Sequence, residues 1–155
     1  IRRVAGEVPE ALVGAGTVLN AEQFDDAVEA GSKFIVSPGF SVELVDAAED
    51  SQVPLLPGVV TSSEIMAALE EGYSLLKFFP AEQAGGAAYL KALSSPFGGV
   101  KFCPTGGVSA ANAKDYLSLP NVLCVGGSWV APKDAVSSGD WARITALSKE
   151  AATLA

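Results

Sequence analysis

The sequence contains no histidine and only two cysteines among its 155 residues. Without histidine, acid–base chemistry near neutral pH has to rely on carboxylates, lysine, tyrosine or cysteine, and a transition-metal site would lack its commonest ligand. Cys103 and Cys124 are too few for a disulfide framework or a zinc site. We therefore expect a cytoplasmic protein with no disulfide scaffold and no metal.

Positive charge and long apolar segments are also scarce. Lys and Arg total 10 against 18 Asp and Glu, the formal net charge is −8, and the basic residues do not cluster. This pattern argues against nucleic acid or an anionic membrane as a partner. No apolar run approaches the roughly 20 residues that cross a bilayer, and no stretch has the pattern of a signal peptide. We expect a soluble protein.

Apolar residues make up 49% of the chain and gather in six short runs. The runs begin roughly every 20 to 26 residues, and each carries glycine, proline or threonine near its end. Continuous rather than alternating apolar character is typical of strands that are buried on both faces, as in parallel sheets. The predicted strands are residues 12–17, 34–39, 54–58, 75–80, 100–106 and 122–128.

Segments with helical spacing of apolar residues separate these runs. They cover residues 21–31, 41–51, 63–72, 86–94, 109–119 and 140–152. Alternation of strands and helices predicts an α/β fold, either a doubly wound sheet or a (β/α) barrel. The regular spacing, and the Gly, Pro and Thr residues at the strand ends, favour the barrel, because barrel active sites are assembled from those ends.

Six strand–helix units do not close an eight-stranded (β/α)8 TIM barrel. We therefore expect residues 1–155 to be a single domain that covers strands 3 to 8, the C-terminal three-quarters of such a barrel, with two units upstream of Ile1. The length of 155 residues, below the roughly 200 typical of the smallest complete barrels, agrees with this expectation.

Lys77 is the first candidate for chemistry, because Leu75, Leu76, Phe78 and Phe79 flank it in an apolar run. Apolar surroundings disfavour the charged ammonium, and attack on a ketone requires the neutral amine. The alternative is a lysine at the solvated end of a strand, which extends into water. The other six lysines stand in helix, loop or turn contexts, which fit that alternative.

Two glycine pairs stand at the ends of consecutive predicted strands, at Gly106-Gly107 and at Gly126-Gly127. Exposed N–H groups at such turns bind anions, and the loops after strands seven and eight of β/α barrels often bind phosphate. Ser128 adds a hydroxyl donor. A single glycine pair is equally consistent with a tight turn, but two pairs in consecutive loops favour a phosphate site.

Two further residues carry weaker signals. The hydroxyl of Thr17, after Gly14-Ala-Gly, could lie at the mouth of the barrel, although a β-branched strand end explains this threonine as well. Glu82 is the carboxylate nearest to Lys77 in the sequence. For Glu82 we favour a position in the first turn of the next helix over a direct role in the site.

Together these motifs resemble the bacterial 2-keto-3-deoxy-6-phosphogluconate (KDPG) aldolases, a family that includes 4-hydroxy-2-oxoglutarate aldolases. The likeness spans the chain, and its most specific parts are Lys-Phe-Phe-Pro-Ala-Glu at 77–82 and Phe-Cys-Pro-Thr-Gly-Gly-Val at 102–108. Further matching segments are residues 13–18, 37–39, 54–58 and 125–129.

The resemblance implies a lyase of the Entner–Doudoroff pathway that is a homotrimer and needs no metal or other cofactor. It implies that Lys77 forms a Schiff base with pyruvate or with the phosphorylated keto acid KDPG, and that KDPG is cleaved to pyruvate and glyceraldehyde 3-phosphate. By the same resemblance, 4-hydroxy-2-oxoglutarate is a second possible substrate. Thr17, Phe79 and Thr105 would contact the substrate, and Gly106, Gly107, Gly127 and Ser128 would hold its phosphate.

One part of the family pattern is absent from these residues. The resemblance implies a catalytic glutamate and a carboxylate-binding arginine in a Glu-Val-Thr-x-Arg motif, and the sequence contains no such motif. We therefore expect impaired activity of this chain by itself. The alternatives are a non-catalytic barrel fragment that binds phosphate or assembles with other chains, and another phosphosugar barrel enzyme.

Overall fold

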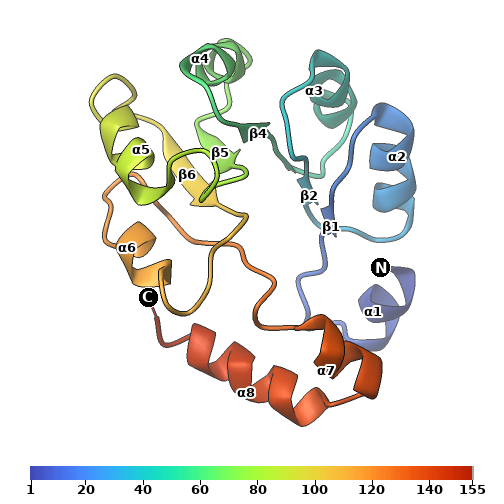
Figure 1. Cartoon of the computed structure of the whole chain (residues 1–155). Coiled ribbons are helices and arrows are strands. Elements are labelled where there is room, and N and C mark those ends of the chain that lie inside the picture. Colours follow the sequence, from blue (N-terminus) through green and yellow to red (C-terminus); the bar gives the residue numbers. More distant parts are fainter. Residues whose placement is uncertain (155) are drawn as a thin grey trace. The chain divides into compact units, whose positions relative to one another are not determined.

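A computed structural model describes residues 1–154 (Figure 1). The chain forms two compact units, residues 1–77 and the residues from 78 onward. The boundary falls within one strand, so that Lys77 ends the first unit and Phe78 begins the second. Within residues 1–154, no helix is both long enough and apolar enough to cross a membrane.

The first unit alternates short strands and helices. Its parallel sheet pairs Ala15 with Ile35 and Ile35 with Leu55, so that these three side chains lie level in adjacent strands. All three are buried, and Phe24 of the following helix packs in the same core cluster. The elements are α1 (Arg2–Glu7), β1 (Ala15–Gly16), α2 (Ala21–Glu29), β2 (Ile35–Val36), α3 (Val42–Glu49), β3 (Leu55–Leu56), β4 (Gly58–Val59) and α4 (Ser62–Glu70).

Side-chain caps define where two helices of this unit begin. The side-chain Oδ1 of Asn20 accepts a hydrogen bond from the backbone N–H of Gln23 at 2.9 Å at the start of α2. At the start of α4, Thr61 and Glu64 form a reciprocal capping box. Such caps satisfy backbone N–H groups that have no partner within the helix, which is why these helices begin at these residues.

The second unit begins at the end of β5 (Leu75–Phe78) and packs around aromatic side chains. The ring of Phe78 stacks on Tyr89 at 5.8 Å between centroids and meets Phe102 edge-on at 6.3 Å. Phe78 and Phe102 are fully buried. The other elements are α5 (Gly86–Leu93), β6 (Lys101–Pro104), α6 (Ala113–Leu117), α7 (Lys133–Ser138) and α8 (Trp141–Ala151).

The expectation of six strand–helix units from an eight-stranded barrel was wrong. The described strands form two three-stranded sheets, in the orders β1-β2-β3 and β4-β5-β6. The run at 54–58, expected as one strand, is divided into β3 and β4. The run at 122–128, expected as a strand, contributes only the isolated bridges Phe102↔Val122 and Thr105↔Gly126.

Two local causes explain these differences. Pro57 lies between β3 and β4 and has no N–H to donate to a strand ladder. The two isolated bridges are three residues apart on the side of β6, at 102 and 105, but four residues apart on the neighbouring segment, at 122 and 126. One extra residue on the second segment interrupts the ladder, as in a β-bulge.

Candidate active site

The sequence predicts eight residues that bind or react with the substrate, and all of them except Lys77 and Thr17 line one cavity in the second unit. Its volume is about 420 Å³, and its lining includes one residue that the sequence did not single out, Val108. The cavity lies where β6 ends and where the segment beside it ends. The lining residues predicted from the sequence are Phe79, Thr105, Gly106, Gly107, Gly127 and Ser128.

Backbone hydrogen bonds fix the wall of this cavity. The N–H of Thr105 donates to the carbonyl of Phe78 at 2.9 Å, and the N–H of Ala81 donates to the carbonyl of Thr105 at 2.9 Å. The N–H of Glu82 then donates to the carbonyl of Gly106 at 3.1 Å. The turn after β5 is thereby attached, residue by residue, to the loop after β6.

Two glycines of the cavity occupy positions where a side chain would not fit. Gly107 has φ +77°, and a Cβ there would lie 2.5 Å from Cγ of Glu82. Gly127 has no room for a Cβ because the ring of Trp129 occupies that space. Glycine is therefore needed at both positions for the loops to keep these paths.

The cavity presents backbone donors without acceptors. Across residues 1–154, the N–H groups of Gly107, Val108, Gly127 and Ser128 donate no hydrogen bond to another part of the chain. Unpaired N–H groups that surround one cavity are suited to an anion, whose oxygens accept several such bonds at once. The geometry therefore favours a phosphate or carboxylate group in this cavity.

Lys77 and Thr17 belong to the first unit. Lys77 is 8% exposed, and its backbone N–H donates to the carbonyl of Pro57 at 2.9 Å. A solvated lysine at a strand end, the alternative weighed above, does not fit this burial. The other six lysines are exposed: Lys33, Lys91, Lys101, Lys114, Lys133 and Lys149.

Thr17 follows β1 and is exposed, with a φ of +63°. A β-branched residue in the left-handed region is strained by about 1–2 kcal/mol. Strained backbone of this kind is concentrated at functional sites, where the surrounding structure holds it in place.

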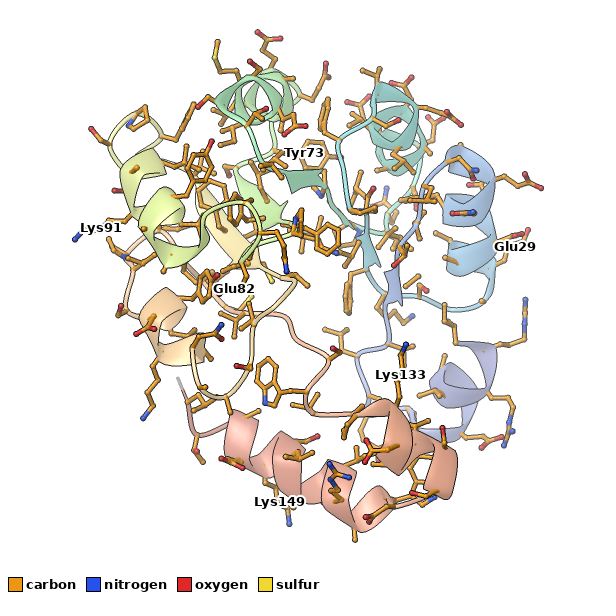
Figure 2. The ribbon with its side chains drawn as sticks, viewed as in Figure 1. Glu29, Tyr73, Glu82, Lys91, Lys133 and Lys149 are labelled. Carbon is orange, nitrogen blue, oxygen red and sulfur yellow. The ribbon has the colours of Figure 1, made fainter. Side chains whose placement is uncertain are left out.

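Glu82 does not cap the next helix, contrary to our preference. Helix α5 begins after Gly85, which has φ +113° and no side-chain cap. The carboxylate of Glu82, on the turn between β5 and α5 (Figure 2), instead accepts a hydrogen bond from the hydroxyl of Tyr116. Burial, together with this hydrogen bond and the charges of Glu82 and Asp115, raises the pKa of Tyr116 well above its ordinary value.

Sequence reasoning missed two residues that support this loop. Tyr116 lies on α6 and is buried, and no local pattern in the sequence pairs it with Glu82. Asn112 donates from Nδ2 to the carbonyl of Gly107 at 3.1 Å, and its Oδ1 accepts the N–H of Ser109 at 2.8 Å. An asparagine shortly after a glycine pair is a typical turn residue, which is the signal that could have identified Asn112.

The described residues thus supply one buried amine and one cavity lined with unpaired N–H groups. Among residues 1–154, no group of three or more His, Cys, Asp or Glu side chains could hold a metal ion. A buried amine permits covalent chemistry on a carbonyl compound. The glycine-lined cavity permits binding of an anionic group.

Comparisons with known proteins agree on one family. Residues 1–147 match the family model described as KDPG and KHG aldolase. The KHG/KDPG aldolase of Escherichia coli K12 is 53% identical over 151 residues, which cover 97% of this chain and 71% of that protein.

Solved structures give the same result. A KDPG aldolase from Legionella pneumophila, with pyruvate captured as a covalent carbinolamine intermediate, is 49% identical with a TM-score of 0.92, over 94% of this chain and 71% of that one. The aldolase of Zymomonas mobilis ZM4 with 3-phosphoglycerate is 48% identical with a TM-score of 0.91, over 99% of this chain and 72% of that one. These matches give no support to the expected impairment of activity, to a non-catalytic role or to another phosphosugar enzyme.

Proposed function

This chain belongs to the KDPG and KHG aldolase family, and from that premise we propose that it cleaves KDPG to pyruvate and glyceraldehyde 3-phosphate through a Schiff base on Lys77. The members to which it is similar are aldolases, which are lyases. The observation that carries the assignment of Lys77 is its burial. Lys77 is 8% exposed, whereas the other six lysines are exposed.

The reaction begins when the neutral amine of Lys77 attacks the C2 ketone and forms a carbinolamine. Loss of water gives a protonated imine, which draws electrons from the C3–C4 bond as that bond breaks. A base removes the C4 hydroxyl proton, directly or through water, and the aldehyde leaves. Protonation of the enamine and hydrolysis of the imine release pyruvate and restore the amine. The carbinolamine captured in the Legionella pneumophila aldolase supports the first step of this route.

The cavity lined by the two glycine pairs is the proposed phosphate site. Its support is the set of unpaired N–H groups at Gly107, Val108, Gly127 and Ser128. Phe79 and Thr105 line the same cavity and are proposed to contact the substrate, as is Thr17. The proposal also retains 4-hydroxy-2-oxoglutarate as a second substrate, because the Escherichia coli relative is named for both activities.

Borohydride trapping tests the covalent step. The chain is incubated with pyruvate and sodium borohydride, digested and mapped by mass spectrometry, with a sample lacking pyruvate as the control. We expect a reduced pyruvyl adduct on Lys77 alone. An adduct on any of the exposed lysines, or none at all, would contradict the assignment.

Inorganic phosphate as a competitor separates the two substrates. We expect phosphate to inhibit cleavage of KDPG, which carries a phosphate, and to leave cleavage of 4-hydroxy-2-oxoglutarate unaffected. No inhibition of KDPG cleavage by phosphate would show that the glycine-lined cavity is not a phosphate site. We further propose that the protein is a homotrimer, which sedimentation velocity tests. We also propose that it works in the cytoplasm.

A further inference from the structure

Cys103 and Cys124 are brought opposite each other by the extra residue in the segment beside β6. Counting forward from the bridge Phe102↔Val122, Leu123 would oppose Cys103. Counting back from the bridge Thr105↔Gly126, Cys124 opposes Cys103. The interrupted ladder therefore places two thiols on neighbouring backbone segments, an arrangement that neither the sequence spacing nor the proposed aldolase reaction explains.

The two side chains lie near enough for Cys103 to lower the pKa of Cys124 by hydrogen bonding, which agrees with their opposed positions between the two bridges. Neighbouring strands lie about 4.8 Å apart, and the Cα atoms of disulfides are usually about 4.4–6.8 Å apart. A disulfide between residues that oppose each other across such a pair thus requires little movement of the backbone.

The two cysteines differ in accessibility and in acidity. Cys124 is exposed and Cys103 is half-buried. The hydrogen bond from Cys103 lowers the pKa of Cys124 from 9.0 to about 7, although burial opposes the shift. A substantial share of Cys124 is therefore thiolate, the reactive form, at neutral pH.

We propose that Cys103 and Cys124 form a redox-active dithiol, in which a peroxide oxidises Cys124 and Cys103 then closes an intrachain disulfide. The Cys124 thiolate attacks one peroxide oxygen, the O–O bond breaks, and the departing hydroxide takes a proton to become water. The product is a sulfenic acid on Cys124. The sulfur of Cys103 attacks it, the S–S bond forms, the S–O bond breaks, and a second water leaves. Two electrons pass from the two sulfurs to the peroxide.

The position of the pair gives this modification a local consequence. Cys103 precedes Thr105 by two residues and Cys124 precedes Gly126 by two, so the disulfide would join the two segments just before the glycine-lined cavity. In the reducing cytoplasm such a bond is transient and is removed by thiols, as expected of a redox-sensing pair rather than of a structural disulfide.

Intact-mass spectrometry of the reduced chain, treated with one equivalent of hydrogen peroxide at pH 7, tests the proposal. We expect a loss of about 2 Da, which dithiothreitol reverses, and a Cys103–Cys124 crosslinked peptide in the non-reduced digest. The reaction should accelerate between pH 6 and pH 8 as the thiolate forms. Sulfinic or sulfonic acid on Cys124 without the mass loss, or crosslinks only between chains, would overturn the proposal.

Two matched variants assign the roles. In Cys103→Ser, we expect Cys124 to stop at a sulfenic acid that dimedone captures, because the resolving thiol is gone. In Cys124→Ser, we expect at least a tenfold slower reaction with peroxide, because the exposed thiolate is gone. Equal rates in the two variants would contradict the assignment of Cys124 as the peroxide-reactive thiol. The mass test on the unaltered chain stands even if a variant folds poorly.

Discussion

The hydroxyl of Tyr116 donates a hydrogen bond to Oε1 of Glu82, 34 positions away in the sequence. Tyr116 is buried on α6, whereas Glu82 lies on the turn after β5. The methylene groups of Glu82 fill the space beside Gly107, and the backbone N–H of Glu82 donates a hydrogen bond to the carbonyl of Gly106. One side chain from a helix thereby supports the glycine pair that lines the proposed phosphate site.

Replacement of Tyr116 by phenylalanine should lower the free energy of unfolding by about 1 kcal/mol, the usual net value of a hydrogen bond whose other partner remains accessible to water. The measurement is urea denaturation at pH 7. Tyr89→Phe is the matched control, since it keeps the ring that stacks on Phe78 and removes a hydroxyl with no hydrogen bond described in residues 1–154. Equal losses in the two variants would contradict the prediction.

The same pair predicts a dependence on alkaline pH. Because the folded state raises the pKa of Tyr116 above its ordinary value of 10.0, the unfolded chain releases this proton first as the pH rises. The stabilisation is thus complete below pH 10 and declines above it. Unfolding measured from pH 8 to pH 11 should show a shallower decline for Tyr116→Phe than for the unaltered chain. Superimposable curves would rule out this linkage.

Gly107→Ala tests the close approach between the loop and Glu82. The new Cβ would lie 2.5 Å from Cγ of Glu82, on a backbone with φ +77° that alanine adopts poorly. We expect a loss of about 1–2 kcal/mol in the free energy of unfolding and at least tenfold weaker binding of inorganic phosphate by calorimetry.

The control for this variant is Gly99→Ala, because a Cβ at Gly99 meets no atom within 4 Å. It should leave both quantities within experimental error. If Gly107→Ala also left phosphate binding unchanged, the cavity after β6 would not be the phosphate site.

Much of the candidate site could be predicted because it depends on strand ends. Residues that end consecutive parallel strands share one edge of a sheet, so strand order indicated that Gly107 and Gly127 would lie together. Phe79 and Thr105, which line the same cavity, were expected only from the family resemblance. The burial of Lys77 was predictable for a similar reason, since its neighbours in the strand are apolar. The last helix, predicted at 140–152 from its apolar spacing, is α8 at Trp141–Ala151, and the side chain of Asp140 caps it.

The predictions that failed concern geometry that no short stretch of the sequence encodes. The run at 122–128 is apolar and reads as a strand, yet one extra residue between the bridges to Phe102 and Thr105 interrupts its ladder. Glu82 lies four residues before the helix that begins at Gly86, and Gly85 in the left-handed region separates Glu82 from the first turn of that helix. The partner of Glu82 is set by how α6 packs, which no short segment of sequence encodes.

Thr17→Gly should raise the free energy of unfolding by roughly 0.5 kcal/mol, although it removes a side chain. The gain is the relief of about 1–2 kcal/mol of strain at φ +63°, offset by the greater flexibility of glycine in the unfolded chain. Thr145→Gly, the same change at ordinary helical backbone in α8, should instead be destabilising. Loss of stability at both positions would show that Thr17 is not strained. If Thr17 contacts the substrate as proposed, Thr17→Gly should also form less of the borohydride-trapped pyruvate adduct.

Lys77→Met replaces the proposed nucleophile with a side chain of similar length that cannot form an imine. We expect the pyruvate adduct to disappear and aldol cleavage to fall by about three orders of magnitude, because the covalent route is closed. Lys91→Met is the matched control, since Lys91 is an exposed lysine of α5 (Figure 2). It should keep the adduct and the turnover of the unaltered chain. Circular dichroism of both variants separates loss of the amine from loss of the fold. Normal turnover by a folded Lys77→Met chain would exclude the Schiff-base mechanism, because no other buried lysine is available among the residues described.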